Sequence, residues 1–442
     1  MWVESLELEN IRCFESATLR FNHGREEPFR WVNFVSENGG GKSTALQALA
    51  LLLAGPEGAQ QLLQRPVGWL RDESKTGKVS ARIHQDEHDP GQFGDEKVRK
   101  AFSYSYVLTG SQLMTVNNKT YTEPAIIPWG QSILTWLRNN AFTSRGAGWF
   151  AAGYGAFRRL TRESQIIVPS LTQPARFTNF LTQFDESALS AVEHWLVHLD
   201  YRIVKQDDPQ AKAQKELGIS AINRVLEPVG ATFDSVTSEG RIMFHLGGQV
   251  VPTIGMSDGF RSILALAGDL IWRLILAFPD SRDALKEPGV VLIDELDIHL
   301  HPKWQREVAS VLRETFPNLQ FFVATHSPLI AAGSGDDALT LKFEQVDGSV
   351  SVRPVENVSA LSVDKVLSSD AFNLVSPFSP ETQRKIDRYD TLRRRRKPLS
   401  GSENREYQKL FEFMETARPI GGPPDPDSLD ARIDAYLEKA IP

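Results

Sequence analysis

Three consecutive glycines, a lysine and two hydroxyl residues stand together early in the chain. Because glycines lack a Cβ atom, their backbone N–H groups can close around phosphate oxygens. In such a loop the lysine reaches the β- and γ-phosphates of a nucleoside triphosphate, and the first hydroxyl coordinates Mg²⁺. The string therefore predicts a triphosphate-binding loop whose contact residues are Asn38, Gly39, Gly40, Gly41, Lys42, Ser43 and Thr44.

The flanking residues have the order strand, loop, helix that such a loop requires. Trp31–Val35 is apolar, and an uninterrupted helical run follows Lys42 up to Gly55 and Pro56, where we expect the helix to stop. The new helix would direct the positive end of its dipole at the phosphates. Ser36 departs from the usual pattern, which has a glycine there. A glycine-rich turn before an amphipathic helix is the alternative interpretation.

A pair of acids follows a second apolar run, Val290–Ile293. A buried strand that ends there places Asp294 and Glu295 at the carboxyl edge of a parallel sheet, beside the phosphate loop. Asp294 would then hold Mg²⁺ through water, and Glu295 would polarise the attacking water. The alternative interpretation is a buried strand that is followed by two charged residues with no catalytic role.

Two further segments have residues that suit a nucleotide site. His326 follows the apolar run Gln320–Thr325, and a histidine at that strand end can donate a hydrogen bond to a γ-phosphate. Ser257 and Gly259 begin a well-patterned helix, whose free N–H groups and dipole make a second anion site. Taken alone, the histidine could be structural and the serine a plain N-cap.

Composition limits the classes of protein to which the chain can belong. Its 442 residues carry a net charge of −7, so any contact with nucleic acid must come from local patches. A single cysteine, Cys13, excludes a disulfide framework and a cysteine-built zinc site. The longest mostly apolar run, Ala45–Ala54, is too short for a membrane span. We therefore expect a cytoplasmic protein without a membrane partner.

The order of these motifs resembles that of ABC-type ATPase heads, whose ligands are ATP and Mg²⁺. By this resemblance, Ser257 and Gly259 belong to the signature motif, which contacts ATP held by the other subunit of a dimer. Asp297 falls in the D-loop and His326 is the switch histidine. The resemblance assigns catalysis to Glu295 and His326, the metal to Ser43 and Asp294, and further nucleotide contacts to Ser257, Gly259 and Asp297.

Within this superfamily the chain is similar to the SMC/RecF branch. The opening segment Leu6–Phe14 resembles the first strand of that branch, in which an arginine lies near the nucleotide, here Arg12. The run Asp294–Pro302 resembles stand-alone bacterial ATPases of anti-phage systems, of the Septu PtuA-like and retron-associated kinds. Segments 149–158 and 363–374 are similar to the same group. A Q-loop is not evident, and Gln165 is its candidate. His299 and His301 belong to the similar turn, so no metal role is assigned to them.

The resemblance implies an α/β fold, a two-lobed ABC-type ATPase head. A mixed β-sheet would carry the phosphate loop, with an antiparallel β layer, a helical insertion and a small helical C-terminal region. We expect the head at residues 1–350, the helical and β insertion at about 165–250, and the C-terminal region at 351–442. Alternating segments at 5–11 and 17–21 predict antiparallel strands, and Ile126–Asn140 predicts a helix.

Several other functions fit the sequence less well. The interval between Lys42 and Ser257 is rich in glycine, proline and aromatic residues and has no sustained heptads or CxxC, which argues against a long coiled-coil tether. A transporter ATPase would have a full Q-loop, and residues 351–442 are too short for a fused TOPRIM nuclease. The favoured hypothesis is an ATP-driven switch that dimerises head-to-head and controls a separate effector, such as a nuclease, in anti-phage defence. A RecF-like ATPase that clamps DNA for repair is the alternative.

Two basic clusters are candidates for nucleic acid or an acidic partner. Eight of the fourteen residues at 384–397 are arginine or lysine, including the run Arg393–Lys397. Arg158, Arg159 and Arg162 form the smaller cluster. A solvated helix end is the alternative for the larger one.

Overall fold

A computed structural model describes the greater part of the chain. The described residues are 1–24, 27–37, 39–85, 101–116, 119–142, 149–156, 180, 191–356, 358–372, 376, 378–395 and 399–416. They form two compact units, Met1–Ser359 and Ala360–Pro442. The functional division predicted above, with its boundary at residue 350, stays a prediction.

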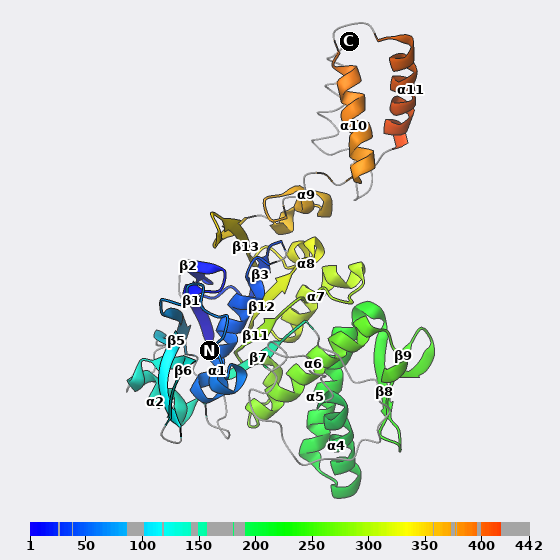
Figure 1. Ribbon diagram of the computed structural model, residues 1–442. Coiled ribbons are helices and arrows are strands. Elements are labelled where there is room, and N and C mark those ends of the chain that lie inside the picture. Colours follow the sequence, from blue (N-terminus) through cyan, green and yellow to red (C-terminus); the bar gives the residue numbers. More distant parts are fainter. Residues whose placement is uncertain are drawn as a thin grey trace. The chain divides into compact units, whose positions relative to one another are not determined.

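A six-stranded sheet with the order β14-β13-β3-β12-β11-β7 forms the centre of the first unit (Figure 1). Its strands are β3 (Trp31–Val35), β7 (Phe150–Tyr154), β11 (Gly289–Ile293), β12 (Leu319–Thr325), β13 (Leu339–Val346) and β14 (Ser349–Val355). All neighbours pair in parallel except β13 and β14. Every residue of β3, β7, β11 and β12 is buried. Burial on both faces explains why these strands are continuous apolar runs in the sequence.

Alternate residues of the central strands belong to two hydrophobic cores. In β11, Val291 and Ile293 pack into one core, and Val290 and Leu292 into the other. The first core includes residues of α4 (Ala191–Gln206), α5 (Pro209–Leu226), α6 (Asp258–Ala277) and α7 (Pro302–Thr315). The second includes α1 (Lys42–Leu62) and α2 (Gln131–Asn140). The helix that follows the phosphate loop is thus enclosed, as its apolar sequence requires.

A five-stranded antiparallel sheet covers α1 in the order β2-β1-β4-β5-β6. Its strands are β1 (Trp2–Ile11), β2 (Phe14–Arg20), β4 (Gly77–His84), β5 (Ala101–Val116) and β6 (Lys119–Trp129). The two predicted N-terminal strands are confirmed, and they pair with each other. A buried amide links this sheet to the central one, because Val3 N donates to Gln320 Oε1 at 2.8 Å and Gln320 Nε2 donates to Val3 O at 3.1 Å.

One predicted helix boundary is wrong, and another is confirmed. Residues 126–129 lie in β6, where Ile126 pairs with Leu108, and the helix begins only at Gln131. Gly130, at φ 104, separates the two elements, and the β-branched pair before Pro128 favours a strand. The helix after the phosphate loop is broken at Gly55, as predicted, because this residue has φ 77 and ψ 174. A second helical segment then continues to Leu62.

After α4 the chain forms a second helix, α5, and then a small sheet. Asp208 caps α5 by accepting hydrogen bonds from Gln210 N and Ala211 N. The three-stranded sheet β10-β9-β8 is antiparallel. The remaining elements are β8 (Ala231–Val236), β9 (Ile242–Leu246), β10 (Gln249–Pro252), α8 (Pro328–Gly333) and the 3₁₀ turns Glu227–Val229, Thr253–Gly255, Ala284–Lys286 and Val358–Ala360.

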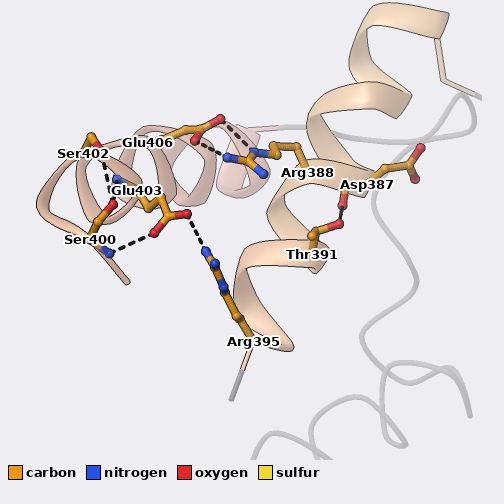
Figure 2. Close-up of polar contacts among 8 residues, drawn as sticks. All are labelled: Asp387, Arg388, Thr391, Arg395, Ser400, Ser402, Glu403 and Glu406. Atoms are coloured by element: carbon orange, nitrogen blue, oxygen red, sulfur yellow. Dashed lines mark hydrogen bonds and ion pairs between the residues drawn. The ribbon is translucent and has the colours of Figure 1, made fainter. Parts of the chain in front are cut away.

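The second unit contains α9 (Val363–Ser368), α10 (Pro380–Arg393) and α11 (Gly401–Thr416). α10 and α11 pack as a hairpin, in which the rings of Tyr389 and Tyr407 stack at 5.2 Å. Arg388 forms two hydrogen bonds with Glu406, and Arg395 pairs with Glu403 (Figure 2). This hairpin is the helical C-terminal region that the sequence predicts. Among the helices that the structure describes, none has the length and apolar character needed to cross a bilayer.

Candidate active site

Three parallel strands end side by side at one edge of the central sheet. Thr325 of β12 pairs in register with Val35 of β3, and Ile293 of β11 pairs with Val323 of β12. Ser36 follows β3, Asp294 follows β11 and His326 follows β12. The carboxyl edge of a parallel sheet is the usual place for a ligand site in α/β proteins. The phosphate loop, the two acids and the histidine therefore meet at this edge.

Lys42 is the centre of the site. Its side chain is 6% exposed, and its Nζ donates a hydrogen bond to Ser36 Oγ at 2.7 Å. The same Nζ lies 3.0 Å from His326 Nε2. Because an ammonium group can only donate, Nε2 must be the acceptor in this contact. The structure thus brings the predicted phosphate-binding lysine and the predicted switch histidine into direct contact.

Burial shifts the pKa values of both partners. Desolvation lowers the pKa of Lys42 to about 8, although the carboxylates of Asp294, Glu295 and Asp297 raise it. The pKa of His326 is also lowered, first by burial and then by the charge of Lys42. A neutral His326 ring agrees with its role as acceptor from Lys42. A buried ammonium beside a histidine is a site prepared for a multiply charged anion.

The glycines of the loop have backbone and packing reasons to be glycine. Gly39 and Gly41 have φ values of 79 and 87, which favour glycine. A Cβ atom on Gly40 would lie 2.4 Å from Ser36 Oγ, and one on Gly41 would lie 2.6 Å from Cys13 Sγ. Ser36, the departure from the usual glycine, therefore both accepts from Lys42 and packs against the loop. Ser43 and Thr44 follow in the first turn of α1, whereas Asn38 lies outside the described residues.

Arg12 is held against the first turns of α1. Its guanidinium donates to Gln47 Oε1 at 2.8 Å and to Thr44 Oγ1 at 3.4 Å. The guanidinium also lies over the ring of Trp69, at 4.3 Å from the centroid. Arg12 itself has φ 45, a left-handed conformation between β1 and β2. These contacts place a fixed positive charge beside Thr44, one residue from the predicted Mg²⁺ ligand Ser43.

The acidic segment after β11 has an unusual backbone. Asp294 is 8% exposed, and its N–H donates to Tyr154 O at 2.8 Å. Glu295 has φ 48, which is uncommon for a residue with a side chain. Asp297 Oδ1 accepts from Thr325 Oγ1 at 2.5 Å and from His326 N at 3.2 Å. Carboxylate and hydroxyl oxygens are the ligands that Mg²⁺ prefers, so Asp294 and Ser43 fit the ion by their chemistry.

Ser257 and Gly259 differ from the residues at the sheet edge. Ser257 is exposed, and its hydroxyl caps α6 by accepting from Phe260 N at 3.4 Å. Gly259 is buried, and a Cβ atom on it would lie 2.2 Å from the carbonyl oxygen of His299. Within one chain, Gly259 therefore has a packing requirement of its own. The structure does not bring Ser257 into hydrogen-bonding contact with Lys42 or His326.

Sequence reasoning missed two residues of this region. Ser36 was noted only as a departure from the usual loop, yet it holds Lys42. Gln305 of α7 bonds to both loops around the acids and His326, and no sequence signal distinguishes it from other polar residues on an amphipathic helix. His301 accepts from Lys303 N and caps α7, which gives it a structural role. Gln165, Arg158, Arg159 and Arg162 lie outside the described residues.

The fold of the described residues is similar to that of a solved SMC head. A crystallised SMC head bound to the C-winged helix domain of ScpA aligns with a TM-score of 0.51 and 16% identity, over 81% of this chain and 99% of that chain. The AAA_21 family model, described as "AAA domain, putative AbiEii toxin, Type IV TA system", matches residues 115–332. The predicted fold class is confirmed.

Sequence relatives narrow the relationship. The Septu protein PtuA of Bacillus mycoides is 26% identical over 88% of this chain and 47% of its own length. The Retron Ec83 probable ATPase of Escherichia coli is 49% identical over 75 residues, which are 17% of this chain and 14% of that protein. This chain thus spans less than half the length of these relatives. The predicted resemblance to Septu and retron ATPases is confirmed, and the fold agrees with the predicted resemblance to SMC heads.

Proposed function

We propose that the chain is an ATP-binding and ATP-hydrolysing switch. The observation that carries the proposal is the meeting of Lys42, Asp294, Glu295 and His326 at one edge of the central sheet. Lys42 and the loop glycines would bind the β- and γ-phosphates, with Arg12 adding positive charge beside Thr44. Glu295 would take the proton of the attacking water, and His326 would move from Lys42 to the γ-phosphate. Mg²⁺, held by Ser43 and Asp294, would neutralise charge on the phosphates.

The same site would control the assembly of two heads. Ser257 is exposed at the positive end of α6, where it can approach a phosphate bound to another subunit. ATP would then lie between two heads, with Ser257 and Gly259 of one subunit facing Lys42 of the other. Hydrolysis would remove the γ-phosphate that both subunits hold, and the heads would separate. In such a switch, the presence of one phosphate group at the interface decides whether the two heads stay together.

We further propose that this switch works in bacterial anti-phage defence, in the cytoplasm, through a separate effector such as a nuclease. The relationship to Septu PtuA and to retron ATPases supports this context. No group of three or more potential metal-binding His, Cys, Asp or Glu side chains occurs among the described residues, so we assign no nuclease centre to them. Nucleic acid remains a candidate partner for the basic cluster at 384–397.

Two measurements on purified protein test this proposal. Phosphate release from ATP with Mg²⁺ should be well above that of a Lys42→Ala variant in the same preparation. With ATP and Mg²⁺, the Glu295→Gln variant should elute from size exclusion at twice the monomer mass, whereas ADP should not produce this shift. Turnover of the wild-type protein no faster than that of Lys42→Ala would refute hydrolysis, and an ATP-independent mass would refute ATP-driven dimerisation.

A further inference from the structure

Gln305, in the first turns of α7, hydrogen-bonds to two loops that carry proposed site residues. Its Nε2 donates to the carbonyl of Leu300 at 2.9 Å and to that of Asp297 at 3.3 Å. Its Oε1 accepts from the hydroxyl of Ser327 at 2.7 Å. Both N–H bonds and the oxygen of a single half-buried amide are therefore used to hold two separate loops together.

The first of these loops runs from Glu295 to Leu300 and contains two strained residues. Glu295 has φ 48 and His299 has φ 66. Left-handed backbone at a residue with a side chain costs on the order of 1 kcal/mol and persists only where surrounding contacts hold it. The two carbonyls that Gln305 binds lie on either side of His299. Gln305 is therefore placed to keep this turn, and the Glu295 carboxylate at its start, in one conformation.

The second loop contains His326. On one side, Asp297 Oδ1 accepts from His326 N and from Thr325 Oγ1. On the other side, Ser327 Oγ caps α8 by accepting from Leu329 N at 3.1 Å, and donates to Gln305. Asp297 and Gln305 thus hold the backbone around His326, and both also take part in the hydrogen bonds of the Glu295–Leu300 turn. A movement of His326 away from Lys42 would act on this network directly.

The turn also touches the beginning of α6. A Cβ atom added to Gly259 would lie only 2.2 Å from the carbonyl oxygen of His299. This contact leaves no free space between the turn and Gly259, two residues after the exposed Ser257. A displacement of the turn therefore has to be accompanied by a displacement at the start of α6.

We propose that Gln305 is a positioning residue that couples the His326 loop to the Glu295–Leu300 turn, and through the turn to Gly259 and Ser257. This inference rests on the proposed function, because it gives His326 and Glu295 the roles described above. It assigns to the chain an internal connection between its own nucleotide and the surface that would face the partner's nucleotide. Gln305 itself touches no phosphate in this account.

The test compares Gln305→Ala with Glu314→Gln, an exposed residue on the same helix. Gln305→Ala should lower kcat about tenfold or more, because the acid and the histidine lose their common support. Its Kd for ATP should stay within about threefold of wild type, because the phosphate loop and the contact of Lys42 with Ser36 are unchanged. Glu314→Gln should change neither. Gln305→Glu, which keeps the size of the side chain but replaces the donor to the two carbonyls, should resemble Gln305→Ala and covers the case in which the smaller residue unfolds the protein.

Double-mutant cycles with His326→Ala and with Glu295→Gln separate positioning from general stability. Because Gln305 supports both the His326 loop and the Glu295 turn, each double variant should lose less activity than the product of its two single losses. Fully multiplicative losses in both cycles, or an unchanged kcat in both Gln305 variants, would overturn the inference while leaving the proposed ATPase intact.

Hydrogen exchange gives a readout that does not depend on hydrolysis. Amide protection at 326–330 and 257–261 should fall in Gln305→Ala and not in Glu314→Gln. If the wild-type protein hydrolyses no ATP, the proposed function fails, and this measurement alone decides the coupling. Equal protection in both variants and the wild type would then contradict it.

Discussion

Charged side chains are concentrated in two regions of this chain, which differ in whether the charges are buried or exposed and in whether they form ion pairs. At the edge of the central sheet, Lys42 is buried, and its contacts are Ser36 and His326 rather than a carboxylate. Desolvation lowers its pKa to about 8. The ammonium group is thus shielded from water, and no described carboxylate forms a direct ion pair with it. That arrangement costs stability and is typical of a site that binds an anion.

The hairpin of α10 and α11 treats its charges differently (Figure 2). Arg388 and Arg395 are exposed and pair with Glu406 and Glu403 on the facing helix. Hydrogen bonds from Ser400 and the pairing with Arg395 lower the pKa of Glu403 to about 2. These ion pairs are satisfied within the hairpin, and exposed pairs of this kind contribute little to stability. The comparison indicates that desolvation of a charge, rather than the density of charge in the sequence, distinguishes a binding site from a solvated surface.

Removing the buried charge should have the largest effect. Lys42→Ala deletes the ammonium that the loop holds for the β- and γ-phosphates, so ATP affinity should fall at least about 100-fold and hydrolysis should be lost. Isothermal calorimetry with ATP and Mg²⁺ measures the affinity, and an unchanged melting temperature establishes that the variant is folded. Tight binding of ATP by this variant would place the phosphate site elsewhere.

Changing the acid beside that charge should affect the rate alone. Glu295→Gln keeps the size of the side chain and leaves Asp294 in place, so the affinity for ATP should remain within a few-fold of wild type. Turnover should fall about 100-fold or more, because the proton acceptor is lost. Single-turnover phosphate release compares the two proteins. If the rate is unchanged, Glu295 is not the base, and His326 is the next candidate.

The lowered pKa of Lys42 predicts a pH dependence. The nucleotide-free protein loses the Lys42 proton above about pH 8, whereas bound phosphates would keep the lysine charged. ATP affinity should therefore be constant below pH 8 and weaken about tenfold for each further pH unit. Lys42→Arg serves as the control, because its side chain stays charged and its affinity should be flat over this range. A flat profile in the wild-type protein as well would contradict the shift.

Much of this site could be predicted from local patterns, and part of it could not. The loop at 39–44, the acids after β11 and His326 after β12 each follow a buried strand, so their common sheet edge follows from parallel topology. The contact between Lys42 and Ser36 depends on the conformation of a single loop, and the bonds of Gln305 depend on how α7 packs against two other loops. The strand at 126–129 was predicted as helix because a short apolar run fits both periods, and pairing with β5 decides it.

The smallest effects are expected in the hairpin, where the basic residues divide into two kinds. Arg393 and Arg394 are exposed and have no ion pair with any residue that the structure describes, whereas Arg395 pairs with Glu403. A double Arg393→Ala, Arg394→Ala variant should leave ATPase activity unchanged and weaken binding of nucleic acid or an acidic partner a few-fold, with a reduced salt dependence for nucleic acid. Arg395→Ala should instead lower the melting temperature by about 2 °C or less. Loss of ATPase activity in the double variant would make these residues part of the catalytic unit.

The central claim is that each ATP is held by Lys42 of one subunit and Ser257 of the other. Ser257 is the residue to change, because it is exposed, whereas Gly259 is needed for packing against His299 in its own chain. In a heterodimer of Lys42→Ala and Ser257→Ala subunits, one site carries both changes and the other carries neither. Random mixing makes about half of the dimers heterodimers, so roughly a quarter of all sites are restored.

The most direct measurement is therefore the ATPase rate of heterodimers purified through two different tags. This account predicts a rate clearly above that of either parent homodimer, approaching half of the wild-type rate per dimer if the two sites work independently. The control for cooperativity between sites is a covalently fused dimer in which one half is entirely wild type and the other half carries both changes. If this fused dimer hydrolyses ATP while the Lys42→Ala/Ser257→Ala heterodimers do not, Ser257 acts within its own subunit and the account is contradicted.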